Sequence, residues 1–449
     1  MPQKLLKLKA VFALCLFLLP LLCFPTLLYS TSTSLNFCLL GYSYFNYIMY
    51  RQLFPVAALA ATTFAQNATN SSSSGTPSLT QLLGSTDSLS TLRTAIQGVP
   101  GLGDILGSAS NVTVLAPSNE AFEKFMSTPQ GAALADNDQD AIQALLQYHV
   151  INGTYPASAV TEMPVFLPTM LNNTMYANVT GGQVVEAVMQ EENVIFYSGL
   201  LNNATVTTAD QNFTGGVVHI IDNVLTVPRN ISSTATSAGL SAVVGALSQA
   251  QLVDTVQSLS DVTIFAPNNS AFQAIGSALP NLTMTQLAGI LSYHVVNGTV
   301  AYSSMLENDM TVPALAGGDL RITISDGDVF VNSAKVLIPD VLVANGVVHV
   351  IDNVLNPNNT MAMPEPTAEV QSAAFEGATS TDNLGGLTSG VPTPTSAEFG
   401  AGPTPAESEE TASGGGAMET GAPAGAAMKK EGAIAMAALF AAGGVYMNA

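Results

Sequence analysis

Histidine and aspartate side chains are the residues of this chain that could carry chemistry. The chain has 449 residues and four histidines, two of which stand three residues before an aspartate. Imidazole and carboxylate groups bind zinc or transfer protons, but a zinc site needs three or four ligands at suitable spacing. Residues 149–222 and residues 294–352 each contain two histidines, one such aspartate, no cysteine and no His-x-x-x-His spacing. We therefore expect structural hydrogen bonds from His149, His219, Asp222, His294, His349 and Asp352.

An acidic run imitates a calcium-binding loop. Asp136, Asp138 and Asp140 alternate as the first oxygen ligands of such a loop do. The loop would then need glycine and glutamate where the chain has Ala141 and Gln147. Helix N-capping by Asp138 or Asp140 explains the run better. The sequence also has no Gly-x-Ser-x-Gly elbow, phosphate loop or catalytic carboxylate framework, so we predict a protein that is not an enzyme and needs no metal or cofactor.

Three phrases occur twice in the same order, which indicates a duplicated module. The first reads Thr-Val-Leu-Ala-Pro-Ser-Asn-Glu-Ala-Phe or a close variant, the second begins with Tyr-His, and the third reads Gly-Val-Val-His-x-Ile-Asp-Asn-Val-Leu. Repeats this long are whole domains rather than solenoid turns. The phrases occupy residues 113–122, 148–154 and 216–225 in the first copy and 263–272, 293–299 and 346–355 in the second.

Helices come first and strands later in each copy. Apolar residues at 240, 243, 244 and 247 follow helical spacing, as do those at 89, 92 and 96 in the first copy. The runs 113–116 and 263–266 predict short strands that stop at proline. A further helix runs into each Tyr-His pair, residues 320–324 alternate before an Asp-Gly turn, and the Gly-Val-Val-His phrase closes each copy as a strand. This order predicts an α+β module.

The three phrases together resemble the fasciclin domain, whose two signature boxes enclose a Tyr-His pair. The resemblance covers residues 78–228 and 236–357. It implies an α+β fold of two tandem fasciclin-like modules, each a wedge or sandwich of strands flanked by helices. It also implies a cell-surface adhesion glycoprotein. In the family the Tyr-His pairs are associated with folding and with adhesion surfaces, and here they are Tyr148, His149, Tyr293 and His294.

A second adhesion candidate precedes the last box. Residues 338–342 read Ile-Pro-Asp-Val-Leu and resemble the Pro-Asp-Ile motif that animal matrix fasciclin proteins present to integrins. Val341 replaces the isoleucine, and the first module has only Thr-Ala-Asp at 208–210. An exposed Asp340 beside Val341 on a loop would be able to contact a receptor or a cation. The structural alternative is that Asp340 caps a turn after Pro339.

Both ends of the chain read as targeting segments. Residues 1–65 hold basic residues and an apolar run, as in a signal peptide, and Met49 opens a second, neater signal that we expect to be the biological start. Residues 358–427 are rich in Pro, Thr, Ser, Gly, Ala and Glu and predict a disordered stalk. The apolar tail 428–449 resembles a GPI-attachment signal with attachment near Gly421, the alternative being a low-complexity tail without a role.

Sequons and cysteines also indicate export. All three cysteines precede residue 66, so the processed protein would have no disulfide. With a formal charge of −21, nucleic acid and anionic membrane surfaces are unsuitable partners. Asn-x-Ser/Thr sequons are frequent, and we expect those beside the first box to stay bare. The glycosylation candidates are Asn152, Asn172, Asn178, Asn203, Asn212, Asn230, Asn281, Asn297 and Asn358.

The sequence thus favours a secreted, glycosylated cell-surface or cell-wall protein that acts in adhesion, with a lipid anchor in the plasma membrane. Its partners would be proteins and glycans of the cell surface, matrix or wall. The alternative is a passive wall or matrix scaffold without a direct adhesive role. An adhesin would lose function when a surface loop changes, whereas a scaffold would respond mainly to loss of the anchor or stalk.

Overall fold

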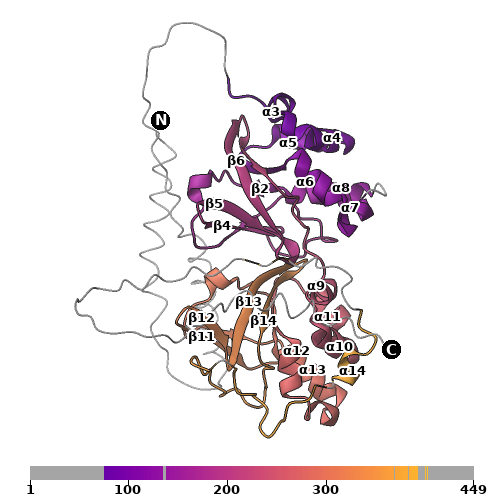
Figure 1. Ribbon diagram of the computed structural model, residues 1–449, viewed down its shortest axis with the longest axis vertical. Helices are drawn as coiled ribbons and strands as arrows, with labels where there is room; N and C mark the ends of the chain where they lie inside the picture. Colours follow the sequence, from indigo (N-terminus) through magenta and orange to yellow (C-terminus); the bar gives the residue numbers. More distant parts are fainter. Residues whose placement is uncertain are drawn as a thin grey trace, which may run out of the picture. The chain divides into compact units, whose positions relative to one another are not determined.

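The computed structural model describes residues 75–134, 138–368, 370–382 and 384–392 together with Gly400 and Gly402 (Figure 1). These residues belong to a compact unit that begins at Ser74. The expected signal segment 1–65, the apolar tail 428–449 and Gly421 lie outside the described residues. No helix in the described part of the chain is long and apolar enough to cross a membrane.

Module 1, defined here as residues 78–228, places its helices before most of its strands. The α-helices are α3 (Leu79–Ser85), α4 (Ser90–Gly98), α5 (Leu102–Ser108), α6 (Asn119–Met126), α7 (Pro129–Leu134) and α8 (Gln139–Tyr148). Short 3₁₀ turns are η2 (Asp87–Leu89), η3 (Ala157–Ala159) and η4 (Gly199–Leu201). The strands are β1 (Val112–Pro117), β2 (Val150–Asn152), β3 (Val165–Pro168), β4 (Val184–Gln190), β5 (Asn193–Tyr197), β6 (Asn203–Phe213) and β7 (Gly216–Ile221).

The strands of module 1 form a seven-stranded sheet in the order β2-β1-β7-β6-β5-β4-β3. Strands β1 and β7 run parallel, and the other neighbours run antiparallel. An isolated bridge from Ile151 to Thr169 joins β2 to the end of β3, so the sheet is nearly closed. Figure 1 shows the helices gathered on one side of this sheet.

Module 2, residues 236–357, repeats this plan with the helix α9 (Ile231–Ser237) leading in from module 1. Its sheet has the order β10-β11-β12-β13-β14-β8-β9, and β14 runs parallel to β8. The helical elements are α10 (Ser241–Gln249), α11 (Val253–Ser258), α12 (Asn269–Ala274), η5 (Leu279–Asn281), α13 (Met284–Tyr293) and η6 (Ser303–Met305). The strands are β8 (Val262–Pro267), β9 (Val295–Val296), β10 (Thr311–Pro313), β11 (Asp319–Ser325), β12 (Asp328–Val331), β13 (Ala334–Val343) and β14 (Gly346–Ile351).

Local sequence explains why these elements begin and end where they do. Every position of β1 and β8 is buried, as expected for strands that run parallel to β7 and β14 and are covered on both faces, and each strand ends at its proline. Helices α8 and α13 end at the tyrosine of the Tyr-His pair. Asp138 caps α8 by accepting hydrogen bonds from two backbone N–H groups, as predicted. Asp326 and Gly327 both have positive φ and turn β11 into β12. The α+β organisation is therefore confirmed.

The first part of the stretch expected as a stalk instead packs on module 2. Helix α14 (Gly385–Thr388) lies against α10, and Leu384 and Leu387 are buried in the core of module 2. Gly245 permits this approach, because a Cβ there would lie 1.5 Å from the Leu387 carbonyl oxygen. Asn353 and Asn356 donate hydrogen bonds to backbone carbonyls of residues 372 and 374. A stalk starting at residue 358 is therefore wrong for residues 371–382 and 384–391, which we call the strap and whose few apolar side chains pack against the core of module 2.

Candidate functional site

The first Tyr-His pair lies inside module 1 and joins α8 to the segment after β7. Tyr148 donates a hydrogen bond to the Val184 carbonyl at 2.8 Å. His149 Nδ1 lies 2.8 Å from the Leu145 carbonyl, and the Leu225 N–H donates to His149 Nε2 at 2.9 Å. Because Nε2 accepts, the ring proton sits on Nδ1. Burial lowers the pKa of His149 to about 4, so the ring is neutral at physiological pH.

The second Tyr-His pair repeats the arrangement in module 2. His294 Nδ1 lies 2.8 Å from the Ile290 carbonyl, and the Leu355 N–H donates to its Nε2 at 2.8 Å. Burial again lowers the pKa of this histidine to about 4. Tyr293 donates to the Asp319 carbonyl at 2.9 Å. All four side chains are buried in the folded modules, so none of them lies on a surface that a receptor could reach.

The box histidines adopt the opposite tautomer. His219 Nδ1 accepts from the Asp210 N–H at 3.2 Å, and its Nε2 lies 2.8 Å from the Tyr155 carbonyl. In module 2, His349 Nδ1 accepts from the Asp340 N–H at 3.2 Å and its Nε2 lies 2.9 Å from the Ala301 carbonyl. The proton therefore sits on Nε2. Each ring spans two backbone segments, which leaves no free nitrogen lone pair for a metal ion on any of the four histidines.

The box aspartates also bind backbone groups. Asp222 Oδ1 accepts from the Thr205 N–H at 2.7 Å, and Asp352 Oδ1 accepts from the Lys335 N–H at 2.7 Å. These bonds tie the turn after β7 or β14 to the preceding strand of the sheet. Among the described residues, no three His, Cys, Asp or Glu side chains gather as metal ligands.

Asp340 and Val341 do not form the exposed loop that the motif resemblance suggested. They lie in β13 at a bulge, where Asp340 has φ +58° and both residues are 1% exposed. Asp340 Oδ1 accepts from the Ser303 N–H at 2.8 Å. Asp210 in module 1 has the same φ and accepts from the Ala157 N–H at 3.0 Å. Two neighbouring hydrogen bonds thus fix the aspartate of each module at the start of a 3₁₀ turn.

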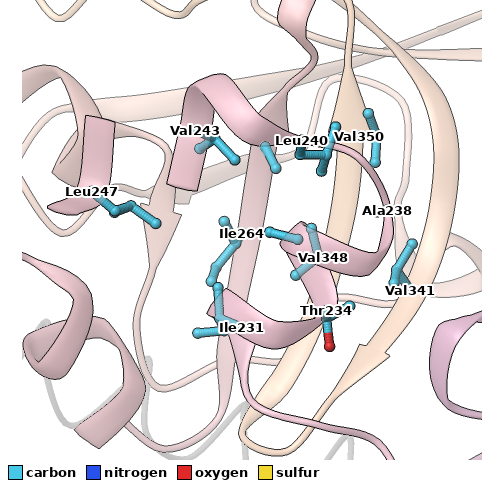
Figure 2. Close-up of a pocket in the computed structure, with 12 residues that line it drawn as sticks. Ile231, Thr234, Ala238, Leu240, Val243, Leu247, Ile264, Val341, Val348 and Val350 are labelled. Carbon is cyan, nitrogen blue, oxygen red and sulfur yellow. The ribbon is translucent and has the colours of Figure 1, made fainter. Parts of the chain in front are cut away.

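Val341 lines a small apolar cavity between α9, α10 and the sheet of module 2 (Figure 2). The cavity measures about 20 Å³, enough for one water molecule, and its walls are almost entirely apolar. It is a packing gap in the core. Its labelled lining residues are Ile231, Thr234, Ala238, Leu240, Val243, Leu247, Ile264, Val341, Val348 and Val350.

The glycosylation candidates are exposed with one exception. Asn178 is half-buried, and its Nδ2 atom donates a hydrogen bond to the Leu259 carbonyl of module 2 at 3.1 Å. A glycan attaches at this nitrogen, so glycosylation of Asn178 would conflict with the contact. The exposed candidates are Asn152, Asn172, Asn203, Asn212, Asn230, Asn281, Asn297 and Asn358.

Module 1 packs directly against module 2 through what we call the inter-module interface. Phe166 of β3 stacks on Tyr302 of module 2 with ring centroids 3.9 Å apart. Val184 of module 1 and Leu342 and Val347 of module 2 are buried around this pair. Burial of apolar area of this kind is the main stabilising term in protein association.

Polar contacts flank the apolar part of the inter-module interface. Gln183 Nε2 donates to the Val343 carbonyl at 3.0 Å. The backbone N–H of Asn178 donates to the Ala344 carbonyl at 2.6 Å. The Thr180 N–H donates to the Asp261 carboxylate at 2.6 Å. These bonds fix the orientation of one module on the other.

Glu186 of β4 is the residue of this interface that the sequence reasoning missed. Its side chain has no exposed surface, and neither carboxyl oxygen has a hydrogen-bond partner among the described residues. Burial, and then the charge of Asp340 in module 2, raise the pKa of Glu186 to about 8. The available signal was an acid within the apolar run Val-Val-Glu-Ala-Val.

Two polar residues of the first box make structural hydrogen bonds that the sequence reasoning did not identify. Thr113 donates to the Gly153 carbonyl at 2.8 Å and accepts from the Tyr155 N–H at 2.9 Å. Asn119 donates to the Asp87 carbonyl at 3.0 Å and accepts from the Thr91 N–H at 3.0 Å. Thr263 and Asn269 make matching bonds in module 2.

Comparisons with known proteins agree with this repeated architecture. A model of the fasciclin domain matches residues 87–228 and 238–357. A fasciclin-like arabinogalactan protein of Arthroderma benhamiae is 40% identical over 292 residues, which are 64% of this chain and 68% of that protein. The fasciclin-like arabinogalactan protein elcF of Phaeosphaeria nodorum is 30% identical over 279 residues, 62% of this chain and 88% of that protein.

More distant matches include animal proteins. Human periostin is 26% identical over 270 residues, 58% of this chain and 30% of periostin. A solved domain pair from the insect cell adhesion molecule fasciclin I aligns with a TM-score of 0.31 and 22% identity, covering 61% of this chain and 98% of that structure. Because the family match spans both modules, and 68% of a relative that is 40% identical is covered, this chain belongs to the fasciclin-domain family.

Proposed function

We propose that this protein is a secreted, glycosylated cell-surface or cell-wall protein that acts in adhesion through its two fasciclin modules. The observation that carries the proposal is that the family match covers two complete modules, which are packed together through a buried interface. Relatives named as fasciclin-like arabinogalactan proteins and as periostin support a role outside the cell. Enzymatic activity is not part of the proposal, because each signature histidine and box aspartate is engaged by backbone groups.

The adhesive surface would lie on the outer faces of the modules and their glycans. The Tyr-His pairs, Asp340 and Val341 are interior residues in the closed pair, so they would act in adhesion through the fold. Eight of the nine candidate sequons are exposed and would place glycans on both modules. Weak contacts by several glycans and loops gain strength from multivalency.

We also propose the targeting scheme that the sequence indicates. Residues 1–65 would be a signal segment with Met49 as its start, and residues 428–449 would be exchanged for a GPI lipid near Gly421. The stalk would begin after the strap on module 2, near residue 393, and continue to residue 427. Mass spectrometry of the purified surface protein would test this scheme by identifying its first residue and its C-terminal modification.

A passive wall or matrix scaffold is the second candidate function. It is favoured by the burial of all six residues that the sequence suggested for adhesion. A scaffold would hold wall glycans or neighbouring proteins without mediating contact between cells.

Bead attachment distinguishes the two functions. Beads would carry glycosylated protein spanning residues 66–392, with deglycosylated protein and bare beads as controls. Single modules are unsuitable for this assay, because each would expose its own apolar side of the inter-module interface and bind non-specifically. Saturable attachment of cells or wall extracts would support adhesion. Attachment equal to that of bare beads would overturn it and favour the scaffold.

A further inference from the structure

Two buried carboxyl groups belong to the two sides of the inter-module interface. Glu186 comes from β4 of module 1, and Asp340 comes from the bulge in β13 of module 2. Both are buried, and the charge of Asp340 acts on Glu186. We propose that this acid pair is a pH-dependent latch: a protonated Glu186 keeps the two modules packed together, and its ionisation favours their separation.

The two acids of the pair differ in their hydrogen bonds. Asp340 Oδ1 accepts a hydrogen bond from the Ser303 N–H at 2.8 Å. Glu186 has no such donor among the described residues. An ionised Glu186 would therefore be a buried charge without a partner beside a second negative charge, which strongly disfavours the packed state.

The other titratable groups around the pair do not supply a neutralising charge. Tyr197 lies opposite Glu186 on β5, and its own pKa is raised by burial and then by Glu186. Tyr302 of module 2 has a pKa raised by burial, by Asp340 and by Asp261. His349 is engaged with the Asp340 N–H through Nδ1 and with a backbone carbonyl through Nε2. None of these three groups places a positive charge beside the two acids.

The duplicated module provides an internal control. Asp210 occupies the same bulge, with the same φ and the same pair of hydrogen bonds as Asp340, but it is exposed. The charge that raises the pKa of Glu186 is that of Asp340, whereas Asp210 is exposed in module 1. The latch is thus a property of the pairing of the modules and does not depend on the proposed role in adhesion.

The pKa of Glu186 sets the pH range of the latch. It is about 8 in the packed state against an ordinary value of 4.5. Separation of the modules releases the proton at any pH between these values, so the opening constant rises by up to about tenfold per pH unit in that range. Between pH 6 and pH 8 the expected increase is about 50-fold. Opening would expose Asp340, Tyr302, Leu342 and Val347 together.

A tryptophan reporter in the intact glycoprotein tests the latch. The chain has no tryptophan, so Phe166→Trp places a single reporter against Tyr302. Acrylamide quenching and the emission maximum would be followed from pH 5 to pH 9, with circular dichroism to monitor the fold. We expect quenching to increase as pH rises and Glu186→Gln to abolish the increase. Asp340→Asn should make it shallower, and Asp210→Asn should leave it unchanged.

Three results would overturn the latch. They are quenching that does not change with pH while Glu186 is present, an increase that persists in Glu186→Gln, and an increase that millimolar calcium suppresses, since the acids would then be cation ligands. Small-angle scattering of the unaltered protein at pH 6 and pH 8.5 provides a second measurement if the reporter disturbs packing. A larger radius of gyration at pH 8.5 supports the latch, and an equal radius overturns it.

Discussion

The buried Tyr-His histidines make the free energy of unfolding depend on pH. His149 and His294 have pKa values of about 4 in the folded protein against an ordinary 6.5. The unfolded chain therefore binds more protons below pH 6.5, and the free energy of unfolding falls as pH drops from about 6.5 to 4. Each histidine contributes a loss of about 1.8 kcal/mol between pH 7 and pH 5, or about 4 kcal/mol for the pair.

Glu186 opposes this loss in the unaltered protein. Its raised pKa destabilises the folded state as pH rises from about 4.5 to 8, so acidification from pH 7 to pH 5 restores about 2.5 kcal/mol. The unaltered protein should therefore lose only about 1 kcal/mol over this interval. Glu186→Gln removes the opposing titration, and the full loss of about 4 kcal/mol should then appear.

Urea denaturation of both proteins at pH 5, 6 and 7, followed by circular dichroism, measures these free energies. In the Glu186→Gln background, His149→Gln should halve the loss on acidification, whatever its effect at pH 7. Equal stability of Glu186→Gln at pH 5 and pH 7 would show that the histidines are not neutral core residues. A loss of the same size in both proteins would show that Glu186 is ionised in the fold.

Three further predictions concern packing and modification. Leu387→Ala should lower the free energy of unfolding by about 2–5 kcal/mol in urea denaturation, because it leaves a gap against α10, whereas the exposed Met361→Ala should have little effect. Asn119→Ala should cost about 0.5–1.5 kcal/mol by the same assay, since it removes the hydrogen bond that Asn119 accepts from the exposed Thr91 N–H. Glycopeptide mapping should find Asn178 unmodified while exposed Asn203 carries a glycan; a glycan on Asn178 would mean that the modules do not pack as described.

Local and repeated features of the fold could be predicted from the sequence. Proline-terminated β1 and β8, the helices that end at Tyr148 and Tyr293, and the Asp-Gly hairpin all follow from periodicity and turn chemistry. The structural role of the histidines was also predictable, because each module lacks cysteine and the His-x-x-x-His spacing that usual zinc sites have.

Long-range features could not be predicted in this way. Asp340 looks like an exposed loop residue because Pro-Asp usually marks a turn, whereas it lies at a bulge of β13 and is buried. Glu186 is a charged residue in an apolar strand, and its sequence does not show that the folded chain leaves it fully buried without a hydrogen-bond partner among the described residues. Leu384 and Leu387 are two apolar residues in a low-complexity stretch, and composition does not show that α10 offers a complementary surface for them.

The strap over module 2 determines how the protein would bear mechanical load. Tension on the chain beyond residue 402 first acts on the hydrogen bond from the Gly400 N–H to the Leu200 carbonyl, at 2.8 Å. It then acts on α14, held on α10 by Leu384 and Leu387, and reaches β14 only when those contacts have parted. A protein anchored through its C-terminal segment would therefore extend in stages, with the strap detaching before either sheet loses a strand.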